Sequence, residues 1–165
     1  MLLLGALVAC APGTTRPPFD PMPAAPKVEL ELVRTEAITR VAEALRADSF
    51  PVARVEVRDG FLETPWFDPA TGVAVSGSPA GPDAVRIRAW ADPGRAYHSE
   101  VTVEAVMRPV ADPSVPGRSL ERLLPATHPM TSKIEALLKE LVSTYGDKDL
   151  VDSTTKALPK AAPTP

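Results

Sequence analysis

The single cysteine of the chain has the most reactive side chain in the sequence, and its position is distinctive. Cys10 ends an apolar run, Leu2 to Ala9, and the proline-rich segment APGTTRPPFDPMPAAP follows at once. A disulfide needs a second cysteine, and zinc sites use several Cys or His ligands at short spacing. An apolar run of this length is typical of a secretory signal, so the position favours covalent modification of Cys10.

The letters LVAC resemble a bacterial lipobox, in which a small residue precedes the cysteine. The resemblance implies that residues 1–9 are a signal peptide, and that Cys10 becomes the mature N-terminus and carries the lipid anchor. No Lys or Arg precedes the apolar run, so either the signal is truncated or the true start lies upstream. The alternative is a buried strand or half-helix in which Cys10 is an ordinary small core residue.

The two histidines, His98 and His128, do not lie in a metal-ligand pattern. Alternation places His98 on a polar strand face, and His128 precedes a proline in a loop, so we expect both to be solvated. The sequence contains no nucleophile elbow, glycine-rich phosphate loop or calcium loop. We therefore expect no metal and no cofactor.

Paired carboxylates are the remaining candidates for catalysis. Glu100 and Glu104 share a strand face, but Arg86 and Arg88 lie on the neighbouring strand and would keep their acidity ordinary. A general acid needs a raised pKa, and no set of groups converges in the sequence. We therefore expect no catalytic residue and a protein that is not an enzyme.

Composition divides the chain and limits its partners. The formal net charge is −3, without a basic run, which disfavours nucleic acid. At 165 residues, 44% of them hydrophobic, the chain can bury one core. The 20 prolines concentrate towards both ends. We therefore expect a proline-rich spacer over 10–27, one domain over 28–147 and a disordered tail over 148–165.

Periodicity predicts two helices and two hairpins. The segments TEAITRVAEALRADSF and SKIEALLKELVSTYG have apolar residues at helical spacing, with Thr35 and Ser132 as expected caps. VARVEV and FLETPW flank Asp59-Gly60, a strong hairpin signal. AVRIRAW and AYHSEVTVEAVMR form the second alternating pair, with a turn of odd length for which three residues, Pro93-Gly94-Arg95, are sufficient. The segment 28–33 fits either a short strand or the first turns of the helix.

This order of elements predicts an α+β fold. Two hairpins make an antiparallel sheet of about four strands, and two helices cover one face in a two-layer sandwich. The other face would be solvated, with Arg88 opposite Glu100 as a polar pair.

Two segments could recognise a partner. Trp66 and Phe67 follow Pro65, which would end pairing at an edge strand and leave both rings available as anchors. The connection RPVADPSVPGRSLERLLPATHP is too long for a simple turn and carries three arginines. The alternative for both segments is that they pack over open ends of the core.

The expected features follow one another in the order lipidated cysteine, proline-rich arm, helix, SFPVARVEV, turn and FLETPW. This order resembles the BamC-like helix-grip lipoproteins of the outer-membrane β-barrel assembly machinery. In that family the second strand carries a threonine, any residue, tryptophan step, as Thr64-Pro65-Trp66 does, and YHSEVTVEAV resembles the final strand. The chain has one such domain where the family has two. The resemblance implies a helix-grip fold and a role in an envelope complex.

The leading functional hypothesis is a lipid-anchored, non-catalytic envelope lipoprotein that binds a protein partner, as an accessory of a membrane assembly complex. Ala11 after Cys10 resembles an outer-membrane sorting signal, so the outer membrane is favoured over the inner one. The domain would then lie in the periplasm or at the cell surface. One alternative is a carrier of a hydrophobic ligand in a helix-grip cleft, and another is an unrecognised hydrolase.

Overall fold

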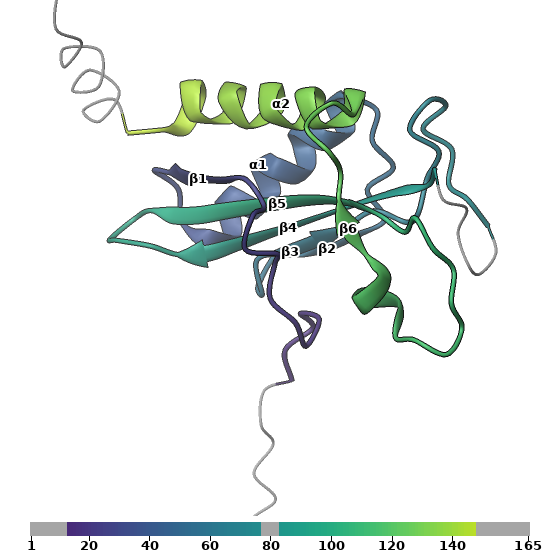
Figure 1. Ribbon diagram of the computed structural model, residues 1–165. Helices are drawn as coiled ribbons and strands as arrows, with labels where there is room; N and C mark the ends of the chain where they lie inside the picture. Colours follow the sequence, from purple (N-terminus) through teal and green to yellow (C-terminus); the bar gives the residue numbers. More distant parts are fainter. Residues whose placement is uncertain (1–12, 77–82, 148–165) are drawn as a thin grey trace, which may run out of the picture.

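The computed structural model of the protein describes residues 13–76 and 83–147. The residue range before β1, 13–26, is called the arm below. Two helices lie on one face of an antiparallel six-stranded sheet, and the arm lies on the other face (Figure 1). The elements in chain order are β1 (Lys27–Leu30), α1 (Arg34–Ala47), β2 (Arg54–Glu56), β3 (Phe61–Glu63), β4 (Val85–Pro93), β5 (Ser99–Met107), the 3-10 helix η1 (Gly117–Leu120), β6 (Arg122–Leu123) and α2 (Pro129–Tyr145).

The α+β class, the two helices and both hairpins are confirmed. The strand order is β1-β5-β4-β3-β2, and β6 also pairs with β5. β1 pairs with the first residues of β5 and β6 with its last two, so these short strands share one edge of β5. The segment for which the sequence left helix and strand open begins as a strand, and the sheet has six strands where about four were expected.

Both helices bury their apolar stripes against the sheet. Ile38 and Val41 of α1 are fully buried, as are Leu62 and Ile87 in the sheet, so the apolar face of α1 is part of the core. The expected caps are wrong. α1 begins after Val33 without a side-chain cap, and α2 begins earlier than predicted because a proline occupies its first turn and His128 caps it.

The register of β4 and β5 explains how their apolar faces coincide. Pro93 pairs with Ser99, and the connection between them, Gly94 to His98, has five residues, an odd number as expected. The longer turn shifts the pairing, so that Arg88 lies opposite Glu104 and the prediction of Glu100 is wrong.

The second face of the sheet is not solvated, which corrects the sequence-based expectation. Arg88 is 3% exposed and Glu104 is fully buried. The arm and the connection between β5 and β6 cover this face (Figure 1). The segment expected to be a spacer therefore packs on the domain over residues 13–26.

Candidate functional site

Seven charged side chains gather beneath the arm on the second sheet face. Arg88 donates to Glu63 at 2.6 Å, to Glu104 at 2.9 Å and to Glu121 at 2.7 and 3.1 Å. Glu63 lies in β3, Arg88 in β4 and Glu104 in β5, and Glu121 directly follows η1. The set, called the ion cluster below, consists of Glu63, Arg86, Arg88, Glu104, Arg108, Arg118 and Glu121.

The ion cluster holds the Glu121 carboxylate in the charged form. Burial by itself raises the pKa of Glu121, but hydrogen bonds and the charge of Arg88, together with Arg118 and Arg108, outweigh burial and lower the pKa to about 2. Burial likewise lowers the pKa of Arg88, and its carboxylate partners more than reverse that effect. Glu121 therefore stays ionised at neutral pH and does not have the raised pKa of a general acid.

The arm completes the ion cluster. The Phe19 ring contacts two guanidinium groups, with its centroid 5.2 Å from Cζ of Arg88 and 4.4 Å from Cζ of Arg118. The Met22 amide donates to Glu104 at 3.0 Å. Such cation–π contacts are worth about 0.5–1 kcal/mol each at partly exposed sites. Phe19 and Met22 are the large apolar residues of an otherwise polar and proline-rich arm, and this is the sequence signal for its docking.

Trp66 and Phe67 are interior residues, and the prediction of an exposed aromatic pair is corrected. Phe67 is 1% exposed and packs in the core with its ring 6.1 Å from that of Phe50. Trp66 is 8% exposed and contacts Arg86 and Arg108, with each Cζ 4.8 Å from the ring centroid. Pro65 does not end the pairing, because Phe67 resumes it by exchanging hydrogen bonds with Val85.

The histidines serve local structure. His128 accepts a hydrogen bond from the Met130 amide at 3.1 Å. His98 lies 2.8 Å from the Ala96 carbonyl, and 11% of its side chain is exposed, less than expected for a solvated residue. Cys10, the predicted lipidation site, lies outside the described residues, as do the predicted signal peptide and tail.

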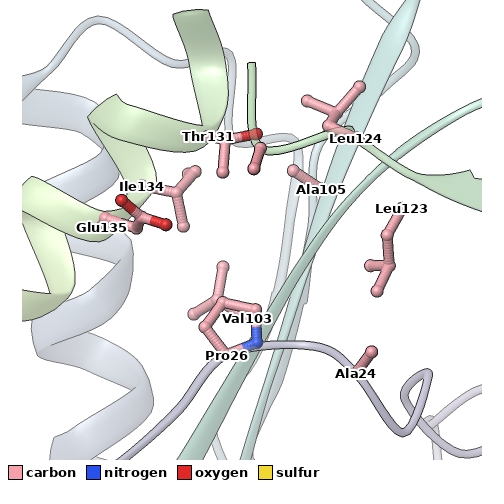
Figure 2. A pocket seen from close by; sticks show the side chains of 10 residues that line it. Ala24, Pro26, Val103, Ala105, Leu123, Leu124, Thr131, Ile134 and Glu135 are labelled. Carbon is pink, nitrogen blue, oxygen red and sulfur yellow. The ribbon is translucent and has the colours of Figure 1, made fainter. Parts of the chain in front are cut away.

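An apolar groove opens beside β5, between the start of β1 and the end of β6 (Figure 2). Its volume is about 260 Å³. Figure 2 shows α2 on one side, the arm below, and Leu123 and Leu124 on the other side. The space, called the β5 groove below, is lined by Ala24, Pro26, Val103, Ala105, Leu123, Leu124, Ala126, Thr131, Ile134 and Glu135.

The β5 groove has an apolar floor and a rim that includes an acidic residue. Val103 and Ile134 are buried in the floor, whereas Ala126 and Glu135 are exposed at the rim. The Val103 amide donates to the Pro26 carbonyl at 3.1 Å. Proline has no N–H to donate in return, so this pairing does not have the second hydrogen bond of a regular ladder. The groove can therefore receive an apolar side chain.

No protein-family model matches the sequence, and a search of curated proteins finds no match. Within residues 13–76 and 83–147, no group of three or more His, Cys, Asp or Glu side chains could hold a metal ion. None of the helices in that part of the chain is long and apolar enough to cross a membrane.

Proposed function

We propose that this protein is a lipid-anchored, non-catalytic binding module of the bacterial envelope, with Cys10 as its anchor and the β5 groove as its contact with a protein partner. The groove carries the proposal. It is an apolar surface between α2, the arm and β5, with exposed residues at its rim. An apolar pocket beside a strand edge is a common means of holding an extended peptide.

The size and position of the β5 groove favour a protein partner over a hydrophobic cargo. Small-molecule sites enclose roughly 300–1,000 Å³ and surround most of the ligand. The β5 groove, at about 260 Å³, is smaller and lies at the sheet edge. The LVAC signal supports an envelope location, and the Thr64-Pro65-Trp66 resemblance to BamC-like domains supports a place in an assembly complex of the outer membrane.

The anchor is tested by Cys10→Ser. We expect this variant to leave the membrane fraction or to remain uncleaved, because the thiol that accepts the lipid is gone. Mass spectrometry of the mature wild-type N-terminus is the direct measurement. An unmodified Cys10 behind an intact Met1 would refute the lipoprotein proposal.

The β5 groove is tested by Ala126→Lys, which places a long charged side chain at the exposed rim. Ala111→Lys is the matched control, since Ala111 is an exposed alanine in a loop away from the groove. We expect the partner that is cross-linked to wild type in membranes to be lost with Ala126→Lys and kept with Ala111→Lys. Retention of the partner by a folded Ala126→Lys protein would exclude the groove.

A further inference from the structure

The beginning of the arm is fastened to the turn between β2 and β3. The amide and hydroxyl of Thr15 donate to Oδ2 of Asp59 at 2.6 and 2.7 Å. Arg58 donates to the Gly13 carbonyl at 3.2 Å, and Arg54 donates to the Thr15 carbonyl. The chain that leads to Cys10 therefore leaves the domain at this turn.

Arg16 strengthens the attachment from the other side of the turn. Its guanidinium pairs with Asp92 at 2.7 Å and donates to the carbonyls of Gly60 and Ala91 at 3.2 and 3.3 Å. Gly60 has φ +62° and a Cβ there would lie 2.5 Å from the Ala91 oxygen, so the turn can approach β4 only with glycine. The turn and the arm thus form one fixed corner of the domain.

The tether from that corner to the anchor is short. Positions 10 and 13 are three residues apart, and three residues of extended chain reach at most about 11 Å. A domain of this size has a radius of gyration of about 14 Å. The tether is therefore shorter than the domain, and the domain cannot turn freely about it.

We propose that the β2–β3 turn lies against the phospholipid headgroups and that α2 lies on the far side of the domain. This inference rests on the proposed lipid anchor at Cys10. Val57 is 42% exposed, and 74% of the Arg58 side chain is exposed. An exposed apolar residue next to a cationic one suits the headgroup region of a membrane. β2 is one edge of the sheet and α2 packs on β1 at the opposite edge.

The orientation is tested with the full-length lipidated protein in vesicles of phosphatidylethanolamine and phosphatidylglycerol. A fluorophore is attached at Val57→Cys or at Ala136→Cys, an exposed position on α2. The lipid occupies the native thiol, so each variant has one reactive cysteine. Nitroxide-labelled headgroups quench at short range. We expect most of the fluorescence at position 57 to be lost and that at position 136 to be retained.

A longer tether provides a second readout. Ten Gly and Ser residues inserted between Ala11 and Pro12 leave the arm contacts intact, and we expect them to abolish the difference between the two labels. The same insertion after Pro165 is the control and should preserve the difference. Equal quenching of both labels on protein that floats with the vesicles would overturn the orientation alone. Failure of the lipidated preparation to float would overturn the proposed anchor and the orientation with it.

Discussion

Arg88 donates to three carboxylates at once, and this is the point where a single substitution has the greatest consequence. Arg88→Met would leave Glu104 and Glu121 buried with less compensation, at 0% and 1% exposure. Removing one partner of a buried ion pair costs about 3–5 kcal/mol. We therefore expect Arg88→Met to lower the free energy of unfolding by roughly that amount, measured by urea denaturation.

Lys27→Met is the matched control for Arg88→Met. The Lys27–Glu100 pair is as short, at 2.7 Å, but about half of each side chain is exposed. Exposed pairs contribute about 0–1 kcal/mol. Similar losses of unfolding free energy in the two variants would contradict the view that burial makes the ion cluster important for stability.

Glu121 gives the stability a defined dependence on pH. Its pKa falls from 4.5 in the unfolded chain to about 2 in the folded protein, so the unfolded state binds the proton more readily. This contribution is complete above pH 4.5 and is lost as the pH falls towards 2. A pKa difference of one unit corresponds to about 1.36 kcal/mol, so the contribution of Glu121 to the free energy of unfolding is about 3 kcal/mol. Urea titrations across this range should show the loss, and Glu121→Gln should have a flatter profile there.

At the scale of elements, α2 provides the clearest test. Leu138 is 4% exposed in the core between α2 and the sheet. Leu138→Ala should lower the free energy of unfolding by about 2–5 kcal/mol. Ala136→Ser, on the exposed face of the same helix, should change it by less than about 0.5 kcal/mol. A change of a few tenths at Leu138 would mean that this stripe is not part of the core.

The elements with local signals were predictable from the sequence. Asp59-Gly60 and the alternation of apolar residues are sufficient for both hairpins, and apolar spacing is sufficient for both helices. β6 was not predicted, and β1 was left open between strand and helix, because strands of two and four residues form only through pairing with a distant β5. Helix starts were also missed, since His128 is an uncommon cap and Ser132 is a favourable one.

The candidate sites depend on contacts between distant residues, which no local sequence pattern indicates. Alternation correctly placed Arg88 and Glu104 on one polar face. It could not show that this face is covered, because the cover includes a hydrogen bond from Arg118 to the Asp20 carbonyl, far apart along the chain. Trp66 was misplaced because Pro65 was taken as the end of a strand, whereas the chain resumes its pairing after the proline.

At the scale of the whole molecule, the two ends of the chain should differ in their effect on folding. Removing residues 11–24 deletes the contacts of Arg16, Phe19 and Met22, and we expect a lower Tm. Removing residues 148–165 should leave the Tm unchanged, because their composition lacks an apolar stripe. Thermal unfolding of both truncated proteins beside the full chain is the measurement. An unchanged Tm after the first truncation would show that the arm adds no stability.

The ion cluster also determines how distant relatives of this protein could be recognised. Its acidic and basic members come from β3, β4, β5 and the η1 region, and a change at one position leaves opposite charges buried at the others. Replacing a whole buried ionic set by apolar residues can be neutral, whereas losing one member is costly. We therefore expect the residues at these positions to be conserved together or replaced together during evolution. Correlated substitution at Arg88, Glu104 and Glu121 would identify homologues whose overall sequence identity to this protein is low.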